Sequence, residues 1–221
     1  LMLNERGDRA EASNVLRSLA ARYPKHEAVP GALLVSGFAL AGDGHYDEAI
    51  NDWSRLERDH PQSPLAEEAL FQKGLAEIRL KREPQATETF GALLKRYPQT
   101  RFEAEARYWR SVLAENAGET AAAEEELRRA VELDAPPALR RKIRYRLAGV
   151  LHKLNKPVEA ADLLQALLNT PSKDDMSPAL LEWLATLRLE QGAFTPAAEA
   201  AETLLNHGKE EAWLQIGGWL L

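Results

Sequence analysis

The densest concentration of reactive side chains in this sequence is a basic run in its second half. Five of the seven residues in Arg140-Arg141-Lys142-Ile143-Arg144-Tyr145-Arg146 are positively charged. On a helix, Lys142 and Arg146 are i,i+4 neighbours, Tyr145 lies beside them, and Lys153 lies further along the same side. Guanidinium and ammonium groups hold carboxylates through charge-assisted hydrogen bonds. This cluster could therefore clamp an acidic segment or a C-terminal carboxylate of a partner.

Two other interpretations of the same run stay open. Charge runs commonly serve only to solvate a helix face, and the acidic residues 124–126 on the preceding helix would then balance the run. The second is an RNA contact, but one basic helix is a small electrostatic footprint in a chain whose net charge is −6. This acidic balance, with a pI of about 5.5, argues against a general nucleic-acid binder, and we expect no nucleic-acid partner.

No constellation of residues predicts catalysis or metal binding. The sequence contains no cysteine, which excludes thiolate chemistry and zinc–thiolate sites in this segment. The five histidines share no helical spacing with one another or with a carboxylate cluster that would form a metal motif. No glycine-rich phosphate loop, nucleophile elbow or catalytic-triad spacing is present. We therefore expect a non-enzymatic protein that needs no cofactor.

The elements that would position these side chains follow a repeat of 37 residues. An alanine recurs at this interval six times, and two apolar columns run in phase with it, four and seven residues further on. These spacings place all three columns on one face of a helix. A fixed period of this size indicates a repeat array, in which each unit buries its apolar face against the next. The columns are Ala12, Ala49, Ala86, Ala123, Ala160 and Ala197; Leu16, Trp53, Phe90, Leu127 and Leu164, closed by Ala201; and Leu19, Leu56, Leu93, Ala130, Leu167 and Leu204.

Each repeat is expected to contain two helices, A and B. In the second copy, helix A covers about residues 31–41, Gly42-Asp43-Gly44 forms the turn, helix B covers about residues 46–59, and Pro61 ends it. The predicted organisation is a partial repeat at 1–24, full repeats at 25–61, 62–98, 99–135, 136–172 and 173–208, and the start of a further helix A at 209–221.

The two ends of the sequence look like parts of incomplete repeats. The sequence begins in the middle of a repeat, and the apolar tail 213–221 has the character of a helix A without its helix B. We therefore expect a segment of a longer protein, although the tail could instead mediate self-association or pack back on the last repeat. No run approaches the roughly 18 apolar residues of a membrane-spanning helix, so we expect no direct membrane insertion.

The pattern within each repeat resembles the tetratricopeptide repeat (TPR). That family has a small residue in helix A, then in helix B an alanine, a large apolar residue and a small or apolar residue, followed by a proline. The resemblance implies an all-α fold, a right-handed superhelix (TPR solenoid) of about five helix-turn-helix repeats with partial repeats at both ends. The period of 37 exceeds the usual one of about 34. The matching residues are Gly37, Ala49, Trp53, Leu56 and Pro61, and again Gly74, Ala86, Phe90, Leu93 and Pro98.

The resemblance also implies where a partner would bind. In the family, helix A lines a concave groove, and the position three residues before the small residue faces that groove. Phe71, Tyr108 and Tyr145 occupy this position and would form an aromatic ladder that anchors a bound peptide or helix. Alternatively, these rings pack between neighbouring A helices. The predicted partner-binding residues are Phe71, Tyr108, Tyr145, Lys142, Arg146 and Lys153.

A local motif is similar to one subset of the family. Tyr97-Pro98-Gln99-Thr100 before a helix A resembles bacterial cell-envelope members of the Tol–Pal coordinator and outer-membrane assembly lipoprotein type. This resemblance implies a non-enzymatic adaptor that binds a protein or peptide segment, in the periplasm or at the outer membrane, and otherwise in the cytoplasm. The alternative is the scaffold or regulatory region of a larger secretion, polysaccharide-export or cell-wall protein.

Overall fold

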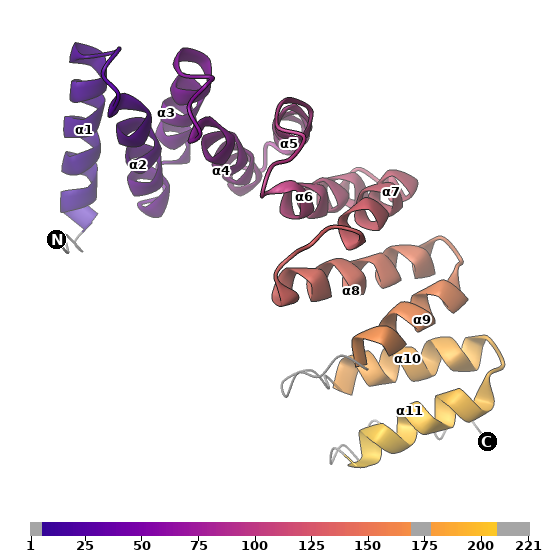
Figure 1. Cartoon of the computed structure of the whole chain (residues 1–221). Helices are drawn as coiled ribbons and strands as arrows, with labels where there is room; N and C mark the ends of the chain where they lie inside the picture. The colour runs from indigo at the N-terminus through magenta and orange to yellow at the C-terminus, as the bar shows by residue number, and fades with distance from the viewer. Residues whose placement is uncertain (1–5, 169–177, 207–221) are drawn as a thin grey trace. The chain divides into compact units, whose positions relative to one another are not determined.

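The computed structural model describes residues 6–168 and 178–206 (Figure 1). These residues form eleven α-helices and contain no β-strand, which confirms the predicted all-α fold. The segment 209–221, expected to begin a further helix A, lies outside the described residues. Contacts divide the chain into two compact units, Leu1–Leu113 and Ala114–Leu221.

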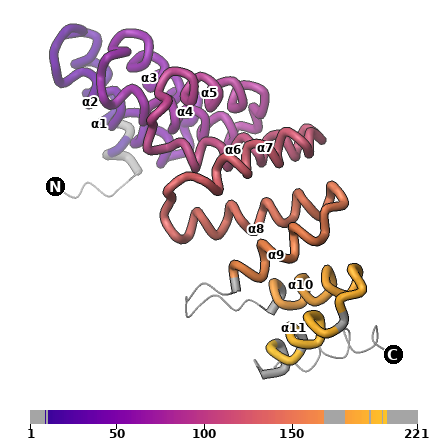
Figure 2. The backbone as a smooth tube through the Cα atoms, turned by 45° about the vertical axis from the view of Figure 1, so that its right-hand side comes forward, coloured from indigo at the N-terminus to yellow at the C-terminus, as the bar shows by residue number. Residues whose placement is uncertain are grey.

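In the first unit, successive helices from α1 to α5 pack side by side along the chain (Figure 2). An apolar core joins α1, α2, α3 and the alanines of α4, and a second core joins α4, α5 and α6. Helix α4 therefore contributes to both cores. The helices are α1 (Arg6–Arg22), α2 (Val29–Gly42), α3 (Tyr46–Asp59), α4 (Ala66–Arg79), α5 (Glu83–Arg96) and α6 (Glu103–Asn116), whose last turn belongs to the second unit.

The second unit continues the same arrangement of consecutive helices. Helix α8 packs on α7 and α9, and α10 packs on α9 and α11. Helix α3 of the first unit has the predicted bounds of helix B in the second repeat, whereas the division into repeats at the other positions stays a prediction. The helices of the second unit are α7 (Thr120–Val131), α8 (Pro137–Lys153), α9 (Pro157–Leu168), α10 (Pro178–Glu190) and α11 (Phe194–Asn206).

The three columns that repeat every 37 residues form the core of the helix pairs. The alanine column is fully buried from Ala49 to Ala197. The bulky column, which includes Trp53 and Phe90, is at most 2% exposed from the second to the fifth copy. The first copy differs, because Leu19 on α1 is 47% exposed. The amphipathic pattern therefore predicted the buried face of helix B correctly on α3, α5, α7 and α9, but not on α1.

The turn from helix A to helix B also repeats every 37 residues. One residue in each turn has a positive φ angle, and it is glycine in three of the five turns. The next residue donates its backbone N–H to a carbonyl five positions back, as His45 does to Leu40 at 2.8 Å. This pattern is the Schellman motif that ends helices with a left-handed residue. The positive-φ residues are Gly44, Lys81, Gly118, Asn155 and Gly192.

The close approach of helices A and B requires a missing side chain on helix A. Gly37 lies directly against the Trp53 ring, and Gly74 lies against the Phe90 ring. A Cβ atom on Gly74 would sit 2.7 Å from Cζ of Phe90, closer than two carbon atoms can approach without a shift. The small residue that the sequence marks in helix A is therefore a packing requirement.

Gly74→Ala should destabilise the protein by about 1–3 kcal/mol, because the new methyl group overpacks the contact with Phe90. The matched control is Gly91→Ala on α5, where a Cβ atom would meet nothing within 4 Å. That variant should gain roughly 0.5–1 kcal/mol from the higher helix propensity of alanine. Urea unfolding followed by circular dichroism measures the free energy of unfolding of both variants. If the free energy of unfolding changed by the same amount and in the same direction in both variants, the packing argument would be contradicted.

Candidate partner-binding face on helices α8 and α10

One side of α8 presents a strip of exposed side chains at helical spacing. Lys142, Tyr145 and His152 are exposed, and with the half-buried Gly149 they follow one another at intervals of three or four residues, so they share one side of the helix. Tyr145 is 46% exposed, the highest value of any aromatic residue of the described part of the second unit. An exposed tyrosine between a lysine and a histidine offers an apolar body with polar groups around it.

Trp183 of α10 completes this strip. Its ring meets Tyr145 edge to face, with centroids 5.3 Å apart, and meets His152 in the same manner at 6.4 Å. Gly149 leaves space beneath the indole, since a Cβ atom there would lie 3.8 Å from it. We call Lys142, Tyr145, His152, Lys153 and Trp183 the aromatic–basic face.

Two of the predicted basic residues are held by an acid on α6. Glu115, whose side chain is 12% exposed, lies 3.1 Å from Nε of Arg146 and 2.8 Å from Nζ of Lys153. Arg146 is 27% exposed and Lys153 is 61% exposed. Arg146 is therefore mainly a link between α6 and α8, whereas Lys153 is fixed in position and still reaches solvent.

Two further residues of the basic run, Arg140 and Lys142, lie in different environments. Arg140 pairs with Asp134 at 2.9 Å and donates to the backbone carbonyl of Ala135, so it fastens the start of α8 to the preceding turn. Lys142 is exposed on the aromatic–basic face. The seven-residue run is thus not one continuous clamp.

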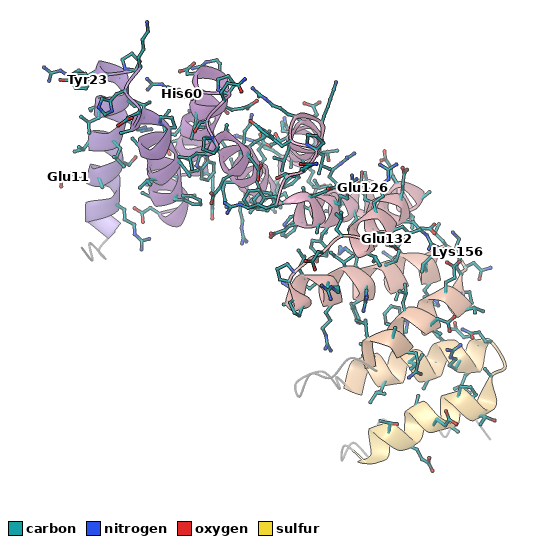
Figure 3. The ribbon with its side chains drawn as sticks, viewed as in Figure 1. Glu11, Tyr23, His60, Glu126, Glu132 and Lys156 are labelled. Atoms are coloured by element: carbon teal, nitrogen blue, oxygen red, sulfur yellow. The ribbon has the colours of Figure 1, made fainter. Side chains whose placement is uncertain are left out.

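The acidic residues of α7 mostly serve other cations. Lys156, labelled in Figure 3, donates to both carboxylate oxygens of Glu124 at 2.8 Å. This hydrogen bonding, reinforced by Arg128, lowers the pKa of the Glu124 carboxyl below its usual range. Glu125 pairs with Arg129. The expectation that residues 124–126 balance the basic run is therefore wrong for Glu124 and Glu125.

The structure corrects the prediction for Phe71, which lies in the first unit. Its ring is 3% exposed. It stacks on Phe102 with centroids 4.5 Å apart and an interplanar angle of 8°, and it also contacts Phe90. Phe71 therefore packs between helices, as the alternative interpretation stated, and does not offer an exposed anchor.

Tyr108, also in the first unit, has an intermediate position. Its ring is half-buried and meets Trp109 edge to face at 5.5 Å. The three residues that share one repeat position thus differ in exposure, with Phe71 buried, Tyr108 half-buried and Tyr145 exposed. Only Tyr145 combines exposure with neighbouring basic groups on the aromatic–basic face.

The sequence analysis did not select Trp183. Residues 37 apart occupy the same position in successive A helices. Trp183 lies two residues before the small residue of its helix A, and the equivalent position two repeats earlier also holds a tryptophan. A tryptophan on a helix A is a strong anchor candidate, so this column would have supplied the signal. The column is Val35, Gln72, Trp109, Arg146 and Trp183.

The arrangement favours binding over catalysis. Flat aromatic edges and lysine ammonium groups can hold an apolar side chain together with a nearby carboxylate. Within residues 6–168 and 178–206, no group of three histidine, aspartate or glutamate residues is placed to hold a metal ion. The helices of the same described ranges include none with the length and apolar character needed to cross a membrane.

Helix pairs of fixed period, joined by recurring turns and small-against-large contacts, define an α-helical repeat scaffold. A sequence profile of the tetratricopeptide repeat-like domain matches residues 48–173, which is more than half of the chain. The chain therefore belongs to the tetratricopeptide repeat-like domain family. A comparison with curated proteins finds no match.

Solved structures resemble the chain over almost its whole length. YrrB, described as a TPR protein with an unusual peptide-binding site, has a TM-score of 0.68 at 12% identity, covering 93% of this chain and 99% of that one. A MamA protein has a TM-score of 0.63 at 16% identity, and the match covers 91% of this chain and 94% of the MamA chain. PilF of Pseudomonas aeruginosa has a TM-score of 0.64 at 13% identity, covering 96% and 90%. At these identities the likeness shows the fold.

Glu115→Gln should lower the stability of the protein by about 1–2 kcal/mol, because the partly buried Arg146 loses the negative charge that lies 3.1 Å from its Nε. The matched control is Glu125→Gln, whose ion pair with Arg129 has both side chains more than half exposed. That change should cost less than about 0.5 kcal/mol. Urea unfolding compares the two variants, and equal losses would show that Glu115 is an ordinary surface acid.

Proposed function

We propose that this protein is a non-enzymatic scaffold that binds a segment of a partner protein on the aromatic–basic face of α8 and α10. The observation that carries the proposal is the pair Tyr145 and Trp183, in which the exposed ring of Tyr145 on α8 meets the half-buried ring of Trp183 on α10 edge to face. Exposed, rigid aromatic side chains are the residues that most often dominate binding energy. Membership of a repeat family whose fold serves protein interaction supports the same conclusion.

The chemistry of the face indicates the chemistry of the partner segment. Tyr145 and Trp183 offer edges and faces for an apolar or aromatic side chain. Lys142 and Lys153 stand on either side of Tyr145 along α8, and Lys153 is held in place by Glu115. A partner segment would therefore carry an apolar anchor with acidic residues, or a terminal carboxylate, beside it. The peptide-binding site ascribed to YrrB gives this mode a precedent within the same fold.

A display library of short peptides should test both the site and its preference. We expect the intact chain to select peptides that combine an apolar or aromatic residue with aspartate or glutamate. Tyr145→Ala should weaken binding of a selected peptide by about 30-fold, the equivalent of ~2 kcal/mol for an anchor residue. Fluorescence anisotropy with the labelled peptide measures the loss.

Further variants show whether the peptide binds at α8 or whether any change of surface charge weakens its binding. Lys142→Glu should weaken the same peptide through charge reversal, whereas Lys95→Glu, an exposed lysine on α5 in the first unit, should not. Tyr108→Ala tests whether the half-buried tyrosine of the first unit takes part. Equal affinity for the parent protein and Tyr145→Ala, or selection of basic peptides, would refute the proposed face.

We further propose that this scaffold works in a bacterial envelope assembly, on its own or as a region of a larger secretion, polysaccharide-export or cell-wall protein. The support is the Tyr97-Pro98-Gln99-Thr100 motif at the turn before α6. If so, osmotic shock or outer-membrane isolation should recover the native gene product with the envelope fraction. Recovery with the cytoplasmic fraction would refute the placement and leave the binding face untouched.

A further inference from the structure

A hollow lies within the second unit, where α7, α8 and α9 meet. Its volume is about 570 Å³, which is within the range of ligand sites. The floor is apolar: Leu147 and Leu151 of α8 are buried in it, and the half-buried Val131 of α7 and Leu163 of α9 complete it. Described helices precede α7 and follow α9 in the sequence, so neither end of the sequence accounts for this hollow.

The hollow and the aromatic–basic face lie on different sides of α8. Leu147 stands two residues from both Tyr145 and Gly149, which places it roughly half a turn around the helix from them. Leu151 follows Leu147 at a spacing of four and shares its side. A ligand in the hollow would therefore leave the aromatic–basic face free.

The equivalent junction of the first unit, three periods earlier in the sequence, is held together by a polar network. Asp52 of α3 accepts a hydrogen bond from Oγ of Ser36 on α2 at 2.5 Å and another from Nε of Arg17 on α1 at 3.2 Å. The hydroxyl groups of Ser13 and Ser36 lie 2.8 Å apart. Ser13, Ser36 and Asp52 are at most 6% exposed, so this network connects the three helices within the protein interior.

At the hollow, two positions of this network carry leucine. Leu147 stands where the first unit has Ser36, and Leu163 stands where it has Asp52. A leucine side chain neither donates nor accepts a hydrogen bond, so the network of the first unit cannot form here. The junction has an apolar floor instead, and another apolar group that excluded water from this floor would be held there by the hydrophobic effect.

The arginine of the network is retained, but its partners are different. Arg128 stands where the first unit has Arg17. It pairs with Glu124 of its own helix at 2.8 Å and with Glu159 of α9 at 2.5 Å. Arg128 and Glu159 are both about half exposed, and exposed ion pairs of this kind contribute little to stability. A charged ligand group can therefore exchange with either partner with little loss of stability.

The two outer helices carry opposite charges at the rim of the hollow. Arg128 and Arg129 line it on α7, and Glu159 and Asp162 line it on α9. Each of these four residues takes part in a surface ion pair, which a ligand can exchange. Glu132, labelled in Figure 3, caps the end of α7 and adds one negative charge to the rim there. A complementary ligand is apolar in the middle, negative toward the two arginines and positive toward α9.

We propose that the hollow between α7, α8 and α9 binds an amphipathic helix of a partner protein. A leucine or another large apolar side chain of this helix enters the hollow, with acidic residues on the side toward α7 and basic residues on the side toward α9. A helix supplies this pattern, because residues three and four positions apart form one apolar stripe with polar residues on both sides. A small apolar molecule would leave the charged rim unmatched, and a helix with one sign of charge would be repelled by one of the two rims.

Fluorescence anisotropy with labelled helical peptides tests the proposal on the full chain. Three peptides of equal length share one leucine stripe and differ only in the residues beside it. The mixed peptide has glutamates on one side and lysines on the other, whereas the second peptide has glutamates on both sides and the third has lysines on both. We expect the mixed peptide to bind about tenfold more tightly than the other two. Equal affinities for the three peptides would overturn the proposal.

Charge reversal at the rim should change the preferred peptide. Arg128→Glu makes the rim on α7 more acidic, so the lysine peptide should become the tightest of the three and the mixed peptide should weaken. Lys95→Glu on α5 of the first unit is also an exposed basic residue and should leave the order of the peptides unchanged. An unchanged order in Arg128→Glu would refute binding at this rim.

A substitution in the floor tests whether the leucine stripe enters the hollow. Leu163→Asp restores the carboxylate that the first unit has at Asp52, so Arg128 should turn to it, and the mixed peptide should lose about tenfold or more in affinity. The control Val35→Asp adds the same charge at an exposed valine of the first unit and should have no effect. Circular dichroism checks that each variant keeps its helices.

Two further results would assign the peptide or the hollow differently. Tyr145→Ala should leave the affinity of the mixed peptide unchanged, and a loss would place the peptide on the aromatic–basic face and overturn this proposal alone. Sedimentation equilibrium of the chain without peptide should show no association that depends on Arg128. Self-association abolished by Arg128→Glu would make a second copy the occupant, and it would overturn the assignment to a partner helix.

Discussion

The close approach of helix A to helix B is the constraint on which the rest of the structure depends. From the second to the fifth copy of the repeat, a small residue in helix A accompanies a bulky one in helix B, and the sizes of the two residues vary together. Glycine at 37 and 74 faces Trp53 and Phe90, whereas the two following copies have serine and alanine in helix A and leucine in helix B, all of them fully buried. Because interiors are packed to near-crystalline density, the volume lost on one side must appear on the other. This compensation lets the sequence vary from repeat to repeat while the contact between helices A and B stays buried.

The parts of the fold that could be predicted from the sequence are those set by residues close together in the chain. The alanine column and the bounds of α3 follow from helical spacing and from local turn signals, and Ala49 and Ala86 are fully buried as expected. The exposure of an aromatic residue is set differently, by side chains that arrive from other helices. Phe71 and Tyr145 share one repeat position, but Phe102 covers the first, whereas Trp183 meets the second only at its edge. The period alone could not distinguish these two environments.

Electrostatic partners were hard to predict for a similar reason. Lys153 binds Glu115 across 38 positions, Lys156 binds Glu124 across 32, and Arg96 binds Glu57 across 39. These intervals are near one period, so the pairs connect neighbouring repeats instead of neighbouring turns of one helix. A count of charges within residues 140–146 shows a dense basic run, yet it cannot show that Arg146 is neutralised from α6. Such pairs contribute modestly to stability where they are exposed, but they fix which basic groups remain available to a partner.

The backbone repeats more faithfully than the side chains. Lys81 and Asn155 adopt the same left-handed conformation as the glycines of the other turns, although a side chain makes this conformation less favourable. The scaffold therefore imposes its geometry even where the local sequence is not ideal for it. Function in such an array must come from positions where copies differ while the backbone stays constant. The aromatic–basic face contains such a position, because Tyr145 is exposed where the equivalent Phe71 is buried against Phe102.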